Sequence, residues 1–270
     1  MKRQVRLIVL LPEEEYPALP ELPPLAGSAG SDALATAISQ VAVAAARDDT
    51  VPALGGIRIE IHGDTLTMVA TDRYRLAIRE LRWDPEQPGL AAAVLVPARV
   101  LDDTARSLTS GAQVSISLGG DSLIGFAGAG RQTTTRLIAA EYPRYAALLP
   151  AEFSAVAELA AGSFADAVRR VALVAERNTP IQLAFSPGQV VLEAGAPGEA
   201  QATDILPAAF DGEELRTAFN PQYLLDGIGA IDSDMVRVSF TTPTRPAVIT
   251  GKGEAQPDYR YVLMPIRSAG

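Results

Sequence analysis

The feature that most constrains this chain is an internal repeat. Pro97 and Pro221 each stand at the expected first turn of a helix, and they lie 124 positions apart. The segment YPRYAALLP at 142–150 is echoed by YRYVLMP at 259–265. A period this long is typical of duplicated domains, because solenoid repeats span only about 20 to 50 residues. The 270-residue chain is therefore predicted to contain two similar units in series.

Both units carry the residue patterns of an α+β fold. Ile57, Ile59 and Ile61 alternate with polar residues, which is typical of a half-buried strand, and similar runs recur along both halves. Leu34 and Ile38 recur at helical spacing. We expect each unit to pack two helices on antiparallel sheets with about eight strands.

Capping residues predict where three of the helices begin. Ser31 and Asn220 directly precede helical patterns, and both residue types accept hydrogen bonds from the first turn of a helix. Ser163 is followed three residues later by Asp166, a spacing similar to a capping box. The sequence thus predicts side-chain caps at these three helix starts.

The composition argues against an enzyme. The chain has no cysteine, which excludes disulfides, zinc–thiolate sites and a cysteine nucleophile. Its one histidine, His62, lies in an alternating strand next to a turn and is expected at the surface. The segment Gly251-Lys252-Gly253 lacks the glycine spacing of a phosphate-binding loop. We expect no catalytic residue, no metal and no cofactor.

The net charge of −9 argues against general nucleic-acid binding, unless basic groups gather on one face. The apolar run 5–11 is too short to span a membrane and lacks a cleavage site. We expect a soluble, cytoplasmic protein without a membrane partner.

Four sequence blocks point to a known family. They are ATDRYRLA at 70–77, EYP at 141–143, NPQYLL at 220–225 and YVLMPIR at 261–267. In this order and at these distances, the chain resembles the bacterial DNA polymerase III beta subunit, the sliding clamp, over about residues 5–267. The resemblance implies repeated clamp domains, each with two helices on antiparallel sheets.

The resemblance covers only part of the family's architecture. Family members have three such domains, and two chains close a six-domain ring, whereas this sequence resembles the second and third domains. Residues 1–25 are expected to hold a remnant of a first-domain strand and a linker. Residues 26–150 resemble the middle domain, and residues 151–270 resemble the C-terminal domain.

The resemblance further implies a pocket between the two domains. Family members bind short linear peptides there, from the DNA polymerase III alpha subunit, the clamp loader and repair polymerases. The matching positions are Leu54, Thr71, Arg73, Tyr74, Arg75, Leu76, Pro143, Leu148, Tyr223, Val262, Met264, Pro265, Ile266 and Arg267. Aliphatic side chains supply apolar contact area, and methionine adapts to varied ligands.

Two positions depart from the family pattern. Arg73 stands where the family has a glycine, and Ala147 stands where it has an arginine. These changes are expected to alter peptide preference and leave the pocket floor in place. Without the resemblance, Thr71–Leu76 is read equally well as a turn and a strand, with Arg75 in a local ion pair.

Helix arginines are candidates for DNA contacts. In the family, the helices face the central hole of the ring and touch the phosphates of double-stranded DNA without reading bases, a salt-dependent contact. The candidates are Arg47, Arg99, Arg106, Arg169, Arg170 and Arg177. The alternative is that each is an ordinary solvated helix charge.

The sequence leaves three arrangements of the whole chain open. Without a first domain, the usual head-to-tail dimeric ring is not expected, and the chain would be monomeric or weakly associated. Three two-domain chains would also supply six domains, if their exposed edges paired. A third alternative is a decoy or inhibitor-resistance role, in which the chain binds peptides or pocket inhibitors without encircling DNA.

Overall fold

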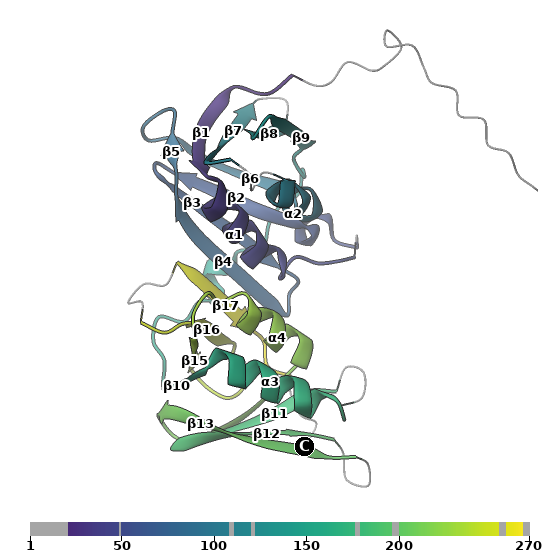
Figure 1. The fold of residues 1–270 in the computed structure, drawn as a ribbon, viewed down its shortest axis with the longest axis vertical. Helices are drawn as coiled ribbons and strands as arrows, with labels where there is room; N and C mark the ends of the chain where they lie inside the picture. The colour runs from purple at the N-terminus through teal and green to yellow at the C-terminus, as the bar shows by residue number, and fades with distance from the viewer. Residues whose placement is uncertain are drawn as a thin grey trace, which may run out of the picture.

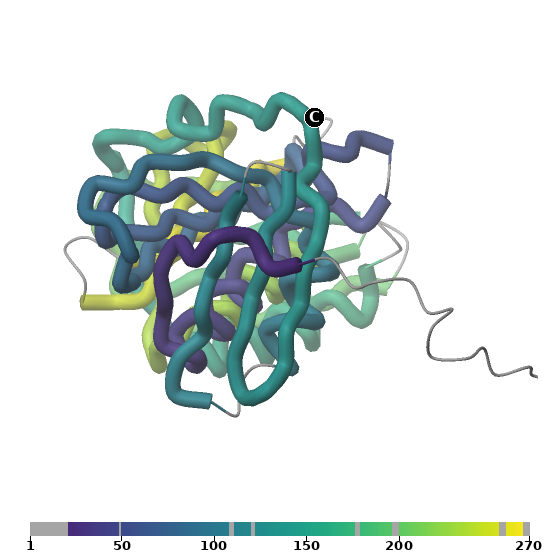
Figure 2. The backbone as a smooth tube through the Cα atoms, turned by 90° about the horizontal axis from the view of Figure 1, so that it is seen from above, coloured from purple at the N-terminus to yellow at the C-terminus, as the bar shows by residue number. Residues whose placement is uncertain are grey.

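The computed structural model describes residues 21–48, 50–107, 111–119, 122–175, 179–195, 200–253 and 258–266. Within these ranges the chain forms two units of the same build, stacked along the long axis of the molecule (Figure 1). Figure 2 looks along that axis, with the first unit in front of the second. The α+β fold of repeated units is confirmed. The apolar run 5–11 lies outside the described residues.

The first unit extends from the first strand to the end of a connecting segment. Its strands are β1 (Leu25–Gly30), β2 (Gly56–His62), β3 (Thr65–Thr71), β4 (Arg75–Arg82), β5 (Asp84–Pro85), β6 (Ala91–Pro97), β7 (Gln113–Gly119), β8 (Leu123–Gly128) and β9 (Arg131–Arg136). Its helices are α1 (Ser31–Ala42) and α2 (Ala98–Ser107), with short 3₁₀ turns at Pro52–Gly55 and Tyr145–Leu148.

The second unit repeats this order. Its strands are β10 (Ala155–Ala160), β11 (Ile181–Ser186), β12 (Gly188–Ala194), β13 (Ala202–Asp211), β14 (Leu215–Phe219), β15 (Met235–Phe240), β16 (Ala247–Gly251) and β17 (Tyr259–Leu263). Its helices are α3 (Ala161–Ala172) and α4 (Pro221–Gly229).

One antiparallel sheet crosses the boundary between the units. Strand β17 of the second unit pairs with β4 of the first, with Tyr259 opposite Arg79 and Leu263 opposite Arg75. The resulting sheet has 12 strands in the order β14-β11-β12-β13-β10-β15-β16-β17-β4-β3-β2-β6. A separate five-stranded sheet, in the order β5-β1-β7-β8-β9, completes the first unit.

The helices run in pairs along one side of the molecule (Figure 1). Helix α1 packs against α2, and α3 packs against α4. The pairs meet at the unit boundary, where Gln40 Nε2 donates to the Ala230 carbonyl at 2.8 Å and the Tyr259 hydroxyl donates to the Gln40 carbonyl at 3.1 Å. No helix in the described ranges is long and apolar enough to cross a bilayer.

Of the three predicted helix caps, only the one at Asn220 is present. Its side chain accepts hydrogen bonds from the backbone N–H groups of Gln222 and Tyr223. At α1 and α3 the preceding strand runs directly into the helix, so Gly30 and Ala160 occupy the cap position, without a side-chain bond.

A different contact supports these two helix starts. The first helical N–H groups, those of Ser31 and Ala161, donate to the carbonyls of Ala112 and Asp234. The predictions for Ser31 and Ser163 were therefore wrong, because a distant backbone carbonyl satisfies a donor that a side chain was expected to bind.

Two apolar clusters hold the fold together. The larger lies between helices and sheets and is continuous across both units. The smaller lies on the opposite face of the junction sheet and includes Leu76, Val248 and Val262. The connecting segment Tyr142–Pro150, called the strap below, covers this smaller cluster, and its Tyr142 hydroxyl bonds the Val69 carbonyl at 3.2 Å.

Candidate functional site

The centre of the site is the loop between β3 and β4. Thr71 Oγ1 donates to the Arg75 carbonyl at 2.6 Å and accepts from the Arg73 N–H at 3.2 Å. Asp72 Oδ1 accepts from the backbone N–H groups of Tyr74 and Arg75, both at 3.1 Å. Threonine and aspartate thus hold a tight three-residue connection by local side-chain bonds.

Arg73 occupies a backbone conformation that favours glycine. Its φ is +81°, in the left-handed region that costs an L-residue about 1–2 kcal/mol. Three-residue hairpin loops commonly place glycine at this position. Arg73 therefore combines a strained backbone conformation with an exposed guanidinium at the edge of the site.

Arg75 is the buried charge of the site. Its Nε bonds Asp72 at 2.9 Å, its Nη1 bonds Asp226 at 2.5 Å, and its guanidinium lies 4.2 Å from the centre of the Tyr223 ring. Burial alone would lower the pKa of Arg75, but Tyr261 and the two carboxylates outweigh this effect and raise the pKa. The side chain is 4% exposed and links the loop to helix α4.

Helix α4 brings Tyr223 and Asp226 to the loop. The Asn220 cap fixes the first turn, which contains Tyr223. Gly227 lets the helix lie directly on Tyr261, because a Cβ there would come within 2.4 Å of the tyrosine ring. The Tyr261 hydroxyl bonds the Tyr223 carbonyl at 2.8 Å, and the Tyr223 ring stacks on Tyr74.

The segment after β17 closes the site from the second unit. The Met264 N–H donates to the Tyr74 carbonyl at 2.9 Å, and the Ile266 N–H donates to the Ala218 carbonyl at 2.8 Å. The first bond places Met264 over the loop. The second turns the chain away toward β14.

These elements enclose an apolar cavity of about 90 Å³ between the units. Buried Leu54, Leu76 and Val262 belong to its lining, and exposed Leu148 lies at its edge. The cavity is lined by Leu54, Thr71, Arg73, Arg75, Leu76, Pro143, Tyr145, Leu148, Val262 and Met264. Nine of the fourteen predicted pocket residues are in this list.

A larger polar hollow of about 440 Å³ adjoins the cavity and shares Leu54, Arg73 and Arg75 with it. Tyr74 and Tyr223, two more predicted residues, line this hollow. Charged groups of both signs surround it: Arg47, Asp48, Asp72 and Asp226. An apolar cavity that shares lining residues with an adjoining polar hollow can hold an apolar side chain and the backbone that continues from it.

Three predicted pocket residues are not in these two spaces. Pro265 and Ile266 line a separate hollow of about 410 Å³ beside Arg216 and Pro243. Arg267 lies outside the described residues.

Sequence reasoning missed Tyr145, whose hydroxyl bonds Glu60 at 2.8 Å. Burial and Glu60 raise the pKa of this tyrosine. The signal was present, because Tyr145 stands between Pro143 and Leu148 in the block that supplied both.

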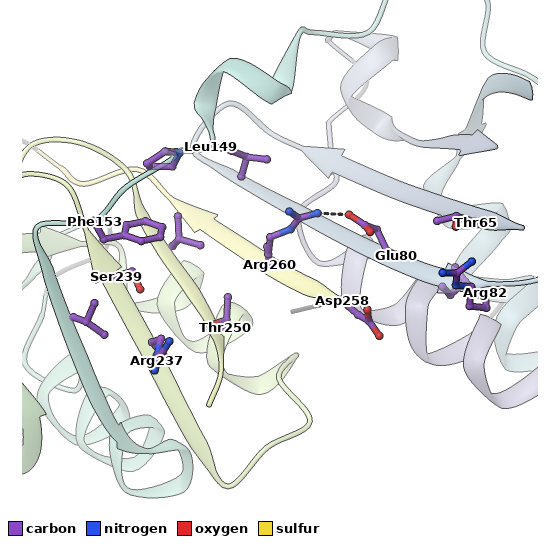
Figure 3. Close-up of a pocket in the computed structure, with 14 residues that line it drawn as sticks. Thr65, Glu80, Arg82, Leu149, Phe153, Arg237, Ser239, Thr250, Asp258 and Arg260 are labelled. Atoms are coloured by element: carbon purple, nitrogen blue, oxygen red, sulfur yellow. Dashed lines mark hydrogen bonds and ion pairs between the residues drawn. The ribbon is translucent and has the colours of Figure 1, made fainter. Parts of the chain in front are cut away.

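A further hollow of about 690 Å³ lies on the other side of the strap (Figure 3). Consecutive strap residues separate the two spaces, since Leu148 lines the apolar cavity and Leu149 lines this hollow. Its polar lining is largely engaged within the chain: Arg260 pairs with Glu80, and Arg237 pairs with Glu158 at 2.7 Å. None of the predicted pocket residues lines it.

The DNA-contact candidates differ in whether their guanidinium groups form ion pairs within the chain. Arg106, Arg169 and Arg170 form ion pairs with Asp102, Asp166 and Asp204, at 2.5, 2.6 and 2.7 Å.

Arg47 and Arg99 are exposed and form no ion pair within the described ranges, and Arg177 lies outside them. The four helices together carry four arginines and five aspartates, so they are not strongly basic.

His62 is exposed at the end of β2. Within the part of the chain that the structure describes, no group of three or more histidine or acidic side chains is placed to hold a metal ion. The described residues of the junction offer apolar contact, cation–π contact, hydrogen bonding and ion pairing.

Sequence models of known families match nearly the whole described chain. Residues 29–144 match the DNA polymerase III beta subunit, central domain, and residues 146–267 match the C-terminal domain of the same subunit. The two matches adjoin at the strap.

Two individual sliding-clamp proteins are similar to this chain over most of its length. The chain is 51% identical over 268 residues to the beta sliding clamp of Streptomyces coelicolor, covering 96% of this chain and 71% of the relative. It is 44% identical over 262 residues to the beta sliding clamp homolog GriR of Streptomyces muensis, covering 95% and 70%.

The similarity also holds for the three-dimensional structure, as a solved sliding clamp shows. The Pseudomonas aeruginosa sliding clamp bound to griselimycin superposes with a TM-score of 0.88 at 29% identity, over 96% of this chain and 70% of that chain.

Proposed function

The chain belongs to the family of the bacterial DNA polymerase III beta subunit, and from this premise we propose that its junction cavity binds linear peptides of replication proteins. The peptide is held by an apolar anchor side chain in the cavity, while its flanking backbone and polar groups lie in the adjoining polar hollow. Residues 26–150 and 151–270 act as the two clamp domains that form the site.

One observation carries this proposal. Residues of the β3–β4 loop, the strap and the segment after β17 belong to separate sequence blocks, and they line a single apolar cavity. Burial of one large aliphatic or aromatic anchor contributes about 1.5–3 kcal/mol. Arg73 at the edge is exposed and suits an acidic group of the peptide.

The proposed partners are the alpha subunit of DNA polymerase III, the clamp loader and repair polymerases, each through a clamp-binding peptide. The Pseudomonas aeruginosa structure contains griselimycin, so a clamp of this family accommodates a bound ligand of that kind. We propose a non-catalytic scaffold role in the cytoplasm for this chain.

Double-stranded DNA is a further proposed partner. Arg47 and Arg99 are the exposed candidates without an intrachain ion pair in the described ranges. Because the helices carry more aspartates than arginines, retention on DNA depends mainly on a closed ring. The decoy alternative predicts peptide binding without any such assembly.

The experiment is a fluorescence-anisotropy titration with a labelled clamp-binding peptide of the polymerase III alpha subunit. We expect saturable binding that an excess of the unlabelled peptide displaces. Met264→Ala is expected to weaken binding about tenfold, because methionine lines the cavity without being part of the buried core. Absence of saturable binding would overturn the assignment.

A further inference from the structure

The strap is attached to the rest of the chain by its side chains. Backbone hydrogen bonds fix the chain at Ile138 before the strap and at Ser154 after it. Between these two residues, no backbone hydrogen bond joins the strap to another element in the described ranges, and the Leu149 N–H donates to the Ala146 carbonyl inside the strap. The position of the strap therefore depends on side-chain contacts.

Two tyrosine hydroxyls make these attachments, and both reach the first unit. The Tyr142 hydroxyl donates to the Val69 carbonyl of β3 at 3.2 Å, and the Tyr145 hydroxyl donates to Glu60 of β2 at 2.8 Å. Tyr142 is 6% exposed and is also held by packing within the smaller apolar cluster. Tyr145 is only half-buried beside that cluster, so its position depends more on its hydrogen bond.

The acceptor of the Tyr145 bond is itself held in place. Arg58 Nε donates to Glu60 Oε1 at 2.6 Å, while Tyr145 donates to the other oxygen, Oε2. The Arg58 guanidinium lies 5.9 Å from the centre of the Tyr142 ring, so the contacts link β2 to both tyrosines. Burial and Glu60 raise the pKa of Tyr145, so the hydroxyl stays protonated and can donate at neutral pH. Hydrogen bonds to a carboxylate are stronger than those between neutral groups.

Tyr145 stands between two strap residues that line the apolar cavity. These are Pro143 and Leu148, and Tyr145 lines the cavity as well. Val262 and Met264, which also line it, come from the second unit. The place of the strap therefore determines the width of the cavity between the two units.

We propose that the Tyr145–Glu60 hydrogen bond is a positioning contact, which fixes the strap where Pro143 and Leu148 form one wall of the peptide cavity. The inference rests on the proposed function, since it concerns the same cavity. Glu60 is not among the residues that line the cavity, so the bond acts through the strap and not by touching the peptide. A wall that is fixed before binding raises affinity, because the peptide does not have to order it.

The first test is the anisotropy titration with the labelled alpha-subunit peptide. Tyr145→Phe keeps the ring in the cavity lining and removes the hydroxyl, and it is expected to weaken binding at least about fivefold. Tyr142→Phe is the matched control, because it removes the other strap hydroxyl from a buried ring that does not line the cavity. Its affinity is expected to stay within about twofold of wild type.

A double-mutant cycle separates positioning from general destabilisation. Glu60→Ala is expected to weaken binding as much as Tyr145→Phe does, and the double variant is expected to show no further loss, because either change breaks the same bond. Glu60→Gln keeps an acceptor oxygen and is expected to recover most of the affinity. Losses that add in the double variant contradict the inference.

The second test needs no peptide. The chain has no native cysteine, so a nitroxide spin label on Ala147→Cys reports on the strap alone. Ala147 is exposed and does not line the cavity. Paramagnetic resonance spectra are expected to show a more mobile label when Tyr145→Phe is added, and little change when Tyr142→Phe is added.

Wild-type affinity in Tyr145→Phe, or label mobility that this substitution leaves unchanged, overturns the inference. Failure of the wild-type chain to bind the peptide is a different result, because it overturns the proposed function. A more mobile label in Tyr145→Phe would still support the attachment of the strap in that case.

Discussion

At the scale of single residues, Arg75 is the side chain that joins the two units at the candidate site. Its carboxylate partners come from the β3–β4 loop and from α4, and the Tyr223 ring lies against its guanidinium. A charge with this little exposure needs both partners, because a buried ion that loses one is strongly destabilising. The neighbouring Arg73 has the opposite character, since it is exposed and adopts a strained backbone conformation.

Arg73→Gly is expected to raise the free energy of unfolding by roughly 1 kcal/mol, because glycine adopts a φ of +81° without steric cost. Urea denaturation measures this change. Arg73→Ala keeps the strain and serves as the control, with no comparable gain expected. Equal stability of the glycine and alanine variants would contradict the strain argument.

At the scale of elements, the cap of α4 supports the site. Asn220→Ala is expected to cost about 1 kcal/mol, because the amide oxygen satisfies two N–H groups of the first helical turn. Ser163→Ala is the matched control: the sequence also suggested a cap there, but α3 begins at Ala161 without a side-chain bond. Thermal unfolding of both variants should show a loss only for Asn220→Ala.

The ion pairs of Glu158 in strand β10 make the free energy of unfolding depend on pH. Hydrogen bonds from Lys252 and Arg237 lower the pKa of Glu158 below its ordinary value. Because the folded-state pKa is lowered, the stabilisation is full above the ordinary pKa and is lost as pH falls through the folded pKa. Chemical denaturation below about pH 4.5 should therefore show a steeper loss in wild type than in Glu158→Gln. Identical acid profiles would exclude this contribution.

The cavity-lining residues came from the family resemblance, because the residues alone left Thr71–Leu76 open between a turn and a strand. The resemblance selected nine residues that line the apolar cavity. It also selected Pro265 and Ile266, which the bond from the Ile266 N–H to Ala218 takes into another hollow. The caps expected at Ser31 and Ser163 failed for a similar reason, because carbonyls distant in sequence satisfy those helix starts.

At the scale of the whole molecule, the two units share one sheet and one continuous apolar cluster. We therefore expect them to unfold together. The one tryptophan, Trp83, is buried in the first unit, so its fluorescence reports on that unit, while far-ultraviolet circular dichroism reports on both. Urea transitions followed by the two signals should coincide. Two separated transitions would show that the junction does not couple the units.

Peptide titration of two neighbouring strap variants tests the central claim, that the apolar cavity is the peptide site. Leu148 lines the apolar cavity, whereas Leu149 lines the hollow on the other side of the strap. Leu148→Ala is expected to weaken binding of the alpha-subunit peptide about tenfold or more, while Leu149→Ala is expected to leave binding within about twofold of wild type. Equal affinities for the two variants, or a larger loss in Leu149→Ala, would contradict it.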